Sequence, residues 1–355
     1  MNTKCTRKRG YFCILLIAVM CVSMLGGCGK KQKEEFEGDK ATVVFQYGNH
    51  IVTLGETYIY AKTVEERYVN QYGEAVWQLI LPATGTDATS MVDLTREAIV
   101  EEIVKVKTLV EHAPDYGIAL NDEEISILEE TAKDFYSGLT DDDIKSMELT
   151  EELVYQVLYE NKIANIVTEK ILERNPVEIS DETARKTTFY DMYFACYSIN
   201  SSGEIVPYSA EEKKTQYDNA LQACSTLGTS GISEEREAQN IEKLAEYYQL
   251  EQAKEQTLTP HEILETYGED VYNLLYSMQN GEYTTVIETE YGYHVFEMIA
   301  LTDEKATKEY KDILTAEETE KQMSNRLETW KKAIDADFSY PESVNMDVYK
   351  QIVVN

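Results

Sequence analysis

Two glycine turns close together near residue 290 constrain the fold of this chain more than any other feature. The segment reads Gly-Glu-Tyr-Thr-Thr-Val from residue 281 and Tyr-Gly-Tyr-His-Val-Phe-Glu-Met from residue 291. Gly281 opens a turn before a short β-prone stretch, and Gly292 marks a second turn. From His294 onward apolar residues alternate with others, which is typical of a strand with one buried face. The segment therefore predicts a helix-following turn, a short strand, a second turn and a longer strand.

This segment resembles the end of a parvulin-type peptidyl-prolyl isomerase domain. In that family a helix, a Gly-Glu-x-Ser/Thr turn and a Gly-Tyr-His strand close the pocket that holds the proline ring. The resemblance implies that His294 is the second of the family's two histidines. It further implies a set of residues that wall the pocket and contact substrate: Leu274, Leu275, Met278 and Tyr293.

The sequence departs from the parvulin pattern at two places. The family's first histidine should fall in a strand around residues 194–197, where this chain has Cys196. The family's Gly-Gly-Asp-Leu-Gly loop has no counterpart, because Gln-Ala-Lys-Glu-Gln-Thr occupies residues 252–257. Rotation about an X-Pro bond has a barrier of about 20 kcal/mol and needs no obligatory nucleophile, only a cup that holds the ring and favours the twisted amide. We therefore expect an isomerase-like domain of reduced or absent activity that still binds extended peptide, with His294 and Cys196 at its centre.

Each of these two residues also has a structural interpretation. His294 can be a buried histidine that holds two strands together through hydrogen bonds. Cys196 can be a small core residue of an aromatic strand.

The N-terminus has the layout of a secretory signal. Basic residues precede an apolar run from Tyr11 to Leu25, and Leu-Gly-Gly-Cys ends at Cys28. The small residues before a cysteine resemble the lipobox of bacterial lipoproteins, which implies cleavage before Cys28 and its lipidation. The alternative is a plain membrane anchor, but the apolar run is shorter than the roughly 20 residues that span a bilayer. We expect a protein outside the cytoplasm, attached to the bacterial cell membrane through lipidated Cys28.

Composition excludes several classes of protein. The net charge of −32 opposes binding to nucleic acid or to anionic lipid headgroups. After removal of the signal and lipidation of Cys28 only Cys196 and Cys224 remain, so the chain is no disulfide scaffold, although one bridge between the two stays open. The histidines have no ligand-spaced partners and Asp141 to Asp143 lack the spacing of a calcium loop, so we expect no metal and no cofactor.

The first half of the mature chain predicts a hairpin followed by helices. Residues 41–53 read as two β-prone stretches around a Gly-Asn turn. Apolar stripes predict helices over 93–111 and 150–174, and Asn121 with Glu124 predicts a capping box between them. The order of hairpin, helix, Tyr-Gly-Ile and acidic cap resembles the N-terminal chaperone region of the PrsA/SurA-type extracytoplasmic foldases.

The second half predicts a smaller lobe and a final helix. Residues 187–199 form an aromatic and β-branched strand, helices follow, 251–257 reads as a polar linker, and the closing strands span 283–300. Thr315 opens a capping box for a C-terminal amphipathic helix. In the family that the chain resembles, such a helix packs on the N-terminal helices.

We therefore predict an α+β fold in which both chain ends form a helical chaperone domain and a parvulin-like domain is inserted. The expected divisions are a signal at 1–27, a flexible tether at 28–40, a helical domain at 41–180, a parvulin-like domain at 187–302 and a tail at 303–355.

The predicted function is that of a membrane-anchored foldase for unfolded or proline-containing secreted polypeptides. The alternative is a non-catalytic lipoprotein adaptor or structural protein that docks one fixed partner of the envelope. A solute-binding lipoprotein is disfavoured, because the helical stretch from 93 to 174 lacks the repeated strand-helix units of two doubly wound lobes.

Overall fold

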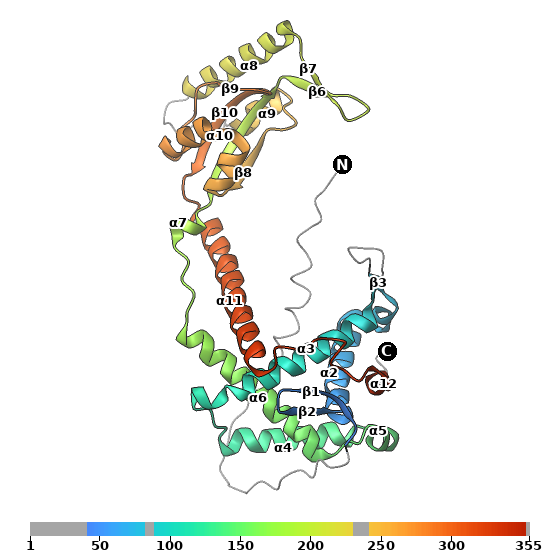
Figure 1. Ribbon diagram of the computed structural model, residues 1–355. Coiled ribbons are helices and arrows are strands. Elements are labelled where there is room, and N and C mark those ends of the chain that lie inside the picture. The colour runs from blue at the N-terminus through green and yellow to red at the C-terminus, as the bar shows by residue number, and fades with distance from the viewer. Residues whose placement is uncertain (1–40, 82–88, 230–240, 353–355) are drawn as a thin grey trace. The chain divides into compact units, whose positions relative to one another are not determined.

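The computed structural model describes residues 41–81, 89–229 and 241–352, and these divide into two compact units. The first unit combines residues up to Pro176 with those from Lys321 onward, and the second spans Val177–Glu320. Figure 1 shows the elements of each unit in chain order. The predicted α+β class is confirmed. Both ends of the chain form a helical unit, and the inserted unit between them contains helices and a four-stranded sheet.

A short hairpin, four long helices and the part of helix α11 (Glu304–Ile334) from Lys321 onward form the first unit. Strands β1 (Val43–Tyr47) and β2 (His50–Thr53) are antiparallel, as predicted. The long helices and the shorter elements of this unit are α2 (Leu54–Tyr72), α3 (Met91–Glu111), α4 (Asp122–Ser137), α6 (Glu151–Arg174), η1 (Glu74–Gln78), η2 (Ala113–Tyr116), β3 (Ile80–Leu81), β4 (Thr89–Ser90), α5 (Asp141–Ser146) and α12 (Met346–Tyr349). Buried apolar side chains from α2, α3 and α6 join those of β1 in one core.

The two ends of the chain meet at the hairpin. The amide of Asn345 donates to the carbonyl oxygen of Val44 at 2.8 Å, and Val344 forms a β-bridge with Phe45. Tyr349 is fully buried in the same core. The C-terminal segment is therefore an integral part of the helical unit.

Helix starts in this unit follow the cap chemistry of the sequence. The Asn121 side chain accepts from the Glu124 amide at 2.9 Å, and the Glu124 carboxylate accepts from the Asn121 amide at 3.1 Å. This confirms the predicted capping box. Thr150 likewise caps α6 by accepting from the Leu153 amide. Such caps satisfy amides that have no partner inside the helix.

The inserted unit is a four-stranded antiparallel sheet with helices on both faces. Its strands lie in the order β8 (Lys254–Leu258), β5 (Thr187–Ala195), β10 (Gly292–Ala300) and β9 (Ile287–Thr289). Helices α8 (Ala210–Thr229) and α9 (Ile241–Tyr247) pack through one core cluster against Met192, Phe194 and Val295. Helix α10 (Pro260–Ser277) packs through another cluster against Phe189, Phe296 and Met298. Successive strand residues point to opposite faces, so each core takes alternate residues.

Two segments of the inserted unit differ from expectation. The predicted strand 187–199 is broken at Cys196 into β5 and a separate strand β6 (Tyr197–Ile199), which pairs with β7 (Ile205–Pro207). Residues 251–257 are not a linker, because 254–257 belong to β8 at the edge of the sheet. An edge strand has one open side and tolerates charged and polar residues such as these.

The C-terminal amphipathic helix is longer than its predicted start implies. Helix α11 (Glu304–Ile334) contains Thr315 in its interior, so the capping box predicted there is wrong. The chain begins this helix earlier because Asp303 accepts from the Ala306 amide through its side chain at 2.9 Å. Its backbone carbonyl also accepts from the Thr307 amide at 2.8 Å. A short helix α7 (Asp181–Ala184) precedes β5 in the inserted unit.

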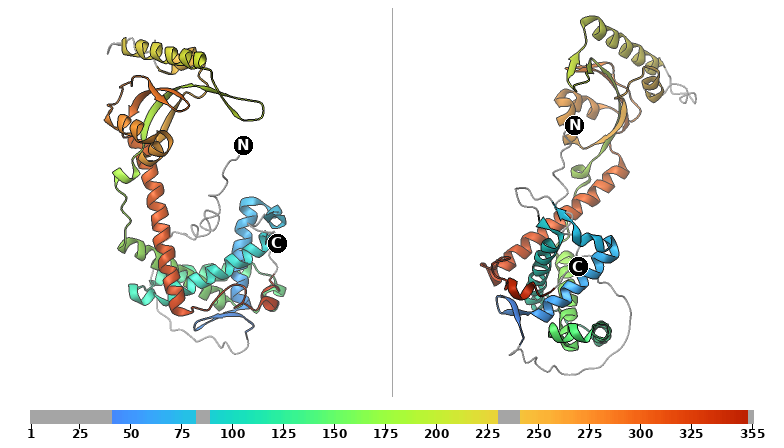
Figure 2. Two further views of the ribbon diagram at one scale, coloured as in Figure 1. Left: turned by 45° about the horizontal axis from the view of Figure 1, so that its top comes forward. Right: turned by 90° about the vertical axis from the view of Figure 1, so that its right-hand side faces the viewer.

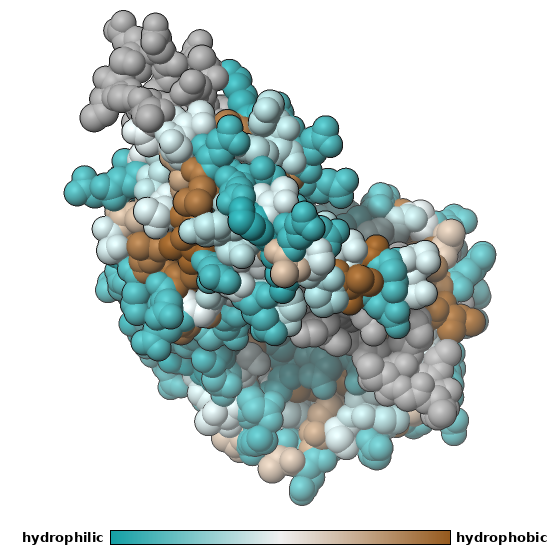
Figure 3. Space-filling view, turned by 90° about the horizontal axis from the view of Figure 1, so that it is seen from above, coloured by the Kyte–Doolittle hydropathy of each residue, from teal (hydrophilic) through white to brown (hydrophobic). Residues whose placement is uncertain are grey.

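Figure 2 gives two further views of these elements. On the face drawn in Figure 3 hydrophilic residues predominate and hydrophobic residues gather in a few patches. Within the described part of the chain, no helix combines the length and apolar character that crossing a bilayer requires. The predicted signal, the tether and Cys28 lie outside the described residues.

Candidate functional site

The register of β5 and β10 places a histidine and an aspartate on the same face of the sheet. His294 lies opposite Tyr193, and Asp191 lies opposite Phe296 two residues along. Residues opposite each other share a face, and so do residues two apart on one strand. The Nδ1 atom of His294 lies 2.8 Å from Oδ1 of Asp191, and both side chains are buried.

A chain of hydrogen bonds continues from this pair to the edge strand β8. Gln256 of β8 donates to the Tyr267 hydroxyl at 2.6 Å, and that hydroxyl donates to Oδ2 of Asp191 at 3.0 Å. Burial, reinforced by the charge of Asp191, raises the pKa of Tyr267 far above its ordinary value. Tyr267 therefore stays a neutral donor at physiological pH. Both carboxylate oxygens of Asp191 thus have a partner.

The other imidazole nitrogen points to β9. Nε2 of His294 lies 3.2 Å from the Thr289 hydroxyl, which itself donates to the carbonyl oxygen of Gly292 at 3.0 Å. We name this set, Gln256, Tyr267, Asp191, His294 and Thr289, the His294 network.

Aromatic rings enclose the imidazole. Tyr193 stacks on it with ring centroids 4.4 Å apart, and Phe296 stacks at 5.3 Å. Tyr267 meets it edge-on at 5.8 Å. His294 is only 7% exposed in consequence.

Packing explains the glycine at the first position of β10. A Cβ atom on Gly292 would collide with the carbonyl oxygen of Phe194 and lie 2.8 Å from the ring of Tyr193. The close approach of β10 to β5 therefore requires glycine at this position. The Gly-Tyr-His sequence serves the strand pairing that positions His294.

The residues predicted to wall a proline pocket are divided between different places. Leu275 and Met278 lie in the core cluster on the α10 face, the face that also carries His294, and Leu274 is half-buried. Tyr293 lies on the opposite face, where its ring contacts Tyr217 of α8 at 5.3 Å. The expectation that Tyr293 and His294 line one pocket is wrong, because neighbouring strand residues point in opposite directions.

Cys196 does not face His294. It lies after the end of β5, where its amide donates to the Tyr291 carbonyl oxygen at 2.8 Å. Neither Cys196 nor Cys224 forms a disulfide. Burial raises the pKa of the Cys196 thiol, which does not favour a reactive thiolate. Asp191 of β5 is the side chain that contacts His294. The expectation that Cys196 lies beside His294 is therefore wrong.

Asp191 carried a signal that could have found it. A single carboxylate in the aromatic run from Thr187 to Ala195 is unexpected in a strand buried on both faces, unless a partner meets it. Tyr267, Gln256 and Thr289 carried no comparable signal, because only the folded sheet and α10 bring them to Asp191 and His294.

A second buried polar cluster lies in the helical unit and joins three helices. Nζ of Lys107 on α3 lies 2.7 Å from Oε1 of Glu56 on α2 and 2.6 Å from Oε2 of Glu160 on α6. Burial raises the pKa of Glu56, although Lys107 opposes that shift. Burial acts to lower the pKa of Lys107, but the two carboxylates outweigh it and raise that pKa. We name these three residues the Lys107 cluster.

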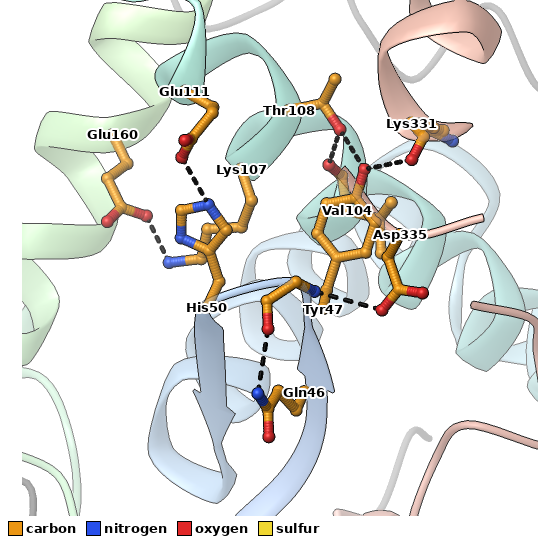
Figure 4. Close-up of polar contacts among 11 residues, drawn as sticks. Gln46, Tyr47, His50, Val104, Lys107, Thr108, Glu111, Glu160, Lys331 and Asp335 are labelled. Carbon is orange, nitrogen blue, oxygen red and sulfur yellow. Dashed lines mark hydrogen bonds and ion pairs between the residues drawn. The ribbon is translucent and has the colours of Figure 1, made fainter. Parts of the chain in front are cut away.

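Figure 4 shows Lys107 near the contacts that fix the hairpin. The Tyr47 hydroxyl lies 2.9 Å from the Thr108 hydroxyl, and His50 Nε2 lies 3.1 Å from a carboxylate oxygen of Glu111. The hairpin turn donates through the Gly48 amide to Asp335 at 3.2 Å. These contacts join the hairpin to α3 and to the segment after α11, within the helical unit.

Neither cluster has the composition of a metal site. Among the described residues no group of three or more His, Cys, Asp or Glu side chains could hold a metal ion. The His294 network combines one imidazole, one carboxylate, hydroxyls and an amide, and these bond to one another. Chemically it fixes the orientation of the imidazole and ties β5, β8, β9 and β10 to α10.

Comparison with known proteins agrees with the resemblance found in the motifs. The sequence matches no protein-family model. The foldase protein PrsA of Clostridium perfringens is 24% identical over 335 residues, which cover 90% of this chain and 92% of that relative. A crystal structure of PrsA from Bacillus subtilis matches 77% of this chain and 99% of its own at 13% identity, with a TM-score of 0.23. PrsA from Streptococcus pneumoniae matches 78% and 100% at 11% identity, also with a TM-score of 0.23. The chain is thus similar in sequence to a PrsA foldase along nearly its whole length.

Proposed function

We propose that this PrsA-like chain is a foldase that acts outside the cytoplasm on unfolded secreted polypeptides. The observation that carries the proposal is the extent of the similarity to the foldase of Clostridium perfringens, which covers 90% of this chain and so includes both units. A chain that kept only one unit of a foldase would not align over such a length. The helical unit is the chaperone part of this proposal.

The inserted unit contributes little or no prolyl isomerisation in this proposal. The imidazole of His294 is 7% exposed and both of its ring nitrogens have partners within the protein. A group that stabilises a twisted amide must reach the substrate, whereas this one reaches only its own sheet. Leu275 and Met278 are likewise buried rather than open to a ligand. These facts favour a structural role for the His294 network.

Attachment to the membrane through lipidated Cys28 completes the proposal. It is supported by the basic start, the apolar run and the Leu-Gly-Gly-Cys sequence. In cells grown with a clickable fatty acid, the chain should carry the label, and Cys28→Ser should abolish it and release the protein from membranes. Label retained by the Cys28→Ser variant would contradict this part of the proposal.

The foldase proposal is tested by suppression of aggregation. The chain should keep several unrelated unfolded proteins in solution at micromolar concentration, as measured by light scattering after dilution from denaturant. A fixed adaptor, the alternative, would protect none of them. Serum albumin at equal mass concentration controls for crowding.

The proposal of low isomerase activity is tested with a proline tetrapeptide. The chain should accelerate the cis-to-trans step weakly or not at all, and His294→Ala should leave any residual rate unchanged. Rates like those of an active parvulin, lost in His294→Ala but kept in the exposed-histidine control His261→Ala, would overturn it.

A further inference from the structure

The β6–β7 hairpin of the inserted unit stands apart from the four-stranded sheet. Its strands, Tyr197–Ile199 and Ile205–Pro207, pair only with each other among the described strands. Figures 1 and 2 show it extending beyond the end of β5. Ile199 is 62% exposed and Ile205 is 54% exposed. The β-hairpin thus exposes two large aliphatic side chains to solvent.

These side chains belong to one face of the hairpin. Ile199 lies opposite Ile205 and Tyr197 lies opposite Pro207, so all four share a face. The ring of Tyr197 contacts that of Tyr291 edge-on at 6.2 Å, and Tyr291 is 51% exposed. An exposed apolar surface therefore runs from the hairpin to the β9–β10 turn. We name it the hairpin strip.

The hairpin also offers backbone hydrogen-bonding groups. The Asn200 amide donates to the Glu204 carbonyl, and the Tyr208 amide donates to the Cys196 carbonyl. In an antiparallel pair, hydrogen-bonded and non-hydrogen-bonded positions alternate. The pair Ile199 and Ile205 therefore directs its amide and carbonyl groups to the outer edges, away from the partner strand. An extended peptide can pair with such an edge.

The charge around the strip is negative. Glu204 is the single charged side chain of residues 197–207, and exposed Glu288 and Glu290 precede Tyr291. Glu288 and Lys213 act with opposite sign on the Cys196 thiol next to Tyr197, so one of these carboxylates and an ammonium both lie near the base of the hairpin. The carboxylates of Glu204, Glu288 and Glu290, opposed by Lys213, favour a ligand with Lys or Arg beside its apolar residues.

The size of the strip argues against a second copy of this chain as its occupant. Each strand has three residues and spans roughly 10 Å at about 3.3 Å per residue. A stable protein–protein interface needs about 800 Å² from each partner, far more than one such strip supplies. A single extended peptide strand matches its dimensions.

We propose that the hairpin strip is a client-binding site that takes an extended apolar segment carrying Lys or Arg, paired to the edge of the hairpin. This inference rests on the proposed foldase function and specifies where the inserted unit meets the client and which segments it prefers. It gives the inserted unit a role that does not depend on isomerisation.

The test uses the full chain and a fluorescein-labelled peptide of alternating Val and Lys, followed by fluorescence anisotropy. The double variant Ile199→Thr/Ile205→Thr keeps β-branched side chains and removes apolar surface, and it should raise the Kd about ten-fold. The matched control Val206→Thr changes an exposed residue on the other face of the same hairpin and should leave the Kd within about two-fold. A peptide with Glu in place of Lys should bind at least about ten-fold more weakly than the Lys peptide.

Three results would overturn the proposal. The first is that the double variant binds the Lys peptide as tightly as the unchanged chain does. The second is equal affinity of the chain for the Lys and Glu peptides. The third is a dimer in sedimentation that depends on the hairpin and excludes the peptide. Circular dichroism and hydrogen exchange of β5 check that the double variant keeps its fold.

Aggregation assays separate this proposal from the foldase proposal. If the full chain protects clients and the double variant protects them equally, the strip is not the client site while the foldase proposal stands. If the full chain binds the peptide through the strip but protects no client, the foldase proposal fails while the strip remains a peptide site.

Discussion

The Lys107 cluster and the His294 network bury charged groups in different ways, one between helices and one across a sheet. Lys107 draws its two carboxylates from two other helices, and the nearest in sequence is about 50 residues away. His294 draws Asp191 from the neighbouring strand and Thr289 from the same hairpin. Helix packing selects partners in the first case, and strand register selects them in the second.

The two clusters also differ in how many buried carboxylates depend on one partner. Two carboxylates share one ammonium in the Lys107 cluster, and all three side chains are nearly buried. In the His294 network a single carboxylate has two partners, one imidazole and one phenol hydroxyl. Removing Lys107 should therefore cost more than removing any member of the His294 network.

The largest effect is expected for Lys107→Met. It leaves two buried carboxylates without a cation and should lower the free energy of unfolding of the helical unit by about 3–5 kcal/mol. Urea titration followed by tryptophan fluorescence measures this unit, because Trp77 and Trp330 both lie in it. Lys170→Met, which breaks an exposed pair with Glu173, is the control and should change stability by less than about 0.5 kcal/mol.

Alkaline pH provides an independent test of the same cluster. The pKa of Lys107 is raised in the folded protein, so its contribution to stability is complete below its ordinary value of 10.5 and is lost as pH rises through the folded pKa. The unchanged chain should lose stability above that pH more steeply than Lys107→Met. Parallel pH profiles would show that the cluster contributes no such linkage.

A smaller effect is expected for Asp191→Ala. It removes the acceptor of both His294 and Tyr267 and should destabilise the inserted unit by about 2–3 kcal/mol. Hydrogen exchange of β5 and β10 amides reports this unit, and tryptophan fluorescence should stay unchanged. The control Asp218→Ala, which breaks an exposed pair with Lys214, should have little effect. If Asp191→Ala behaves like the control, the pair does not hold the sheet.

Tyr267→Phe should cost less again. The ring stays in place while the hydroxyl between Gln256 and Asp191 is lost, so about 1 kcal/mol is expected in the same exchange measurement. Tyr272→Phe on the same helix is the matched control. A cost above that of Asp191→Ala would place the centre of the network at Tyr267 instead of at the Asp191–His294 pair.

The smallest effect compares helix caps in the two units. Asn121→Ala on α4 and Thr259→Ala on α10 each remove the acceptor of a capping box and should cost up to about 1 kcal/mol. The replacements Asn121→Asp and Thr259→Ser keep the acceptor and should be close to neutral. A large loss at only one position would show that the cap carries tertiary contacts as well.

The sequence by itself determined the local features of this protein. The Asn121 box, the start of α6 after Thr150, the hairpin around Gly48 and the strand expected from His294 onward follow from local sequence. Apolar periodicity likewise predicted the buried faces of α3 and α6, because each helix buries its own stripe. His294 was identified through its motif, which is also local.

Only the tertiary structure decided which of these features meet. Strand register brought Asp191, and not Cys196, to His294, and it turned Tyr293 to the opposite face. A side chain reverses its direction with every residue of a strand, so an assignment that is wrong by one position selects the wrong face. The sequence also did not predict the start of α11 at Glu304 or the Lys107 cluster. They depend on contacts between segments far apart in the chain, and no local pattern records such contacts.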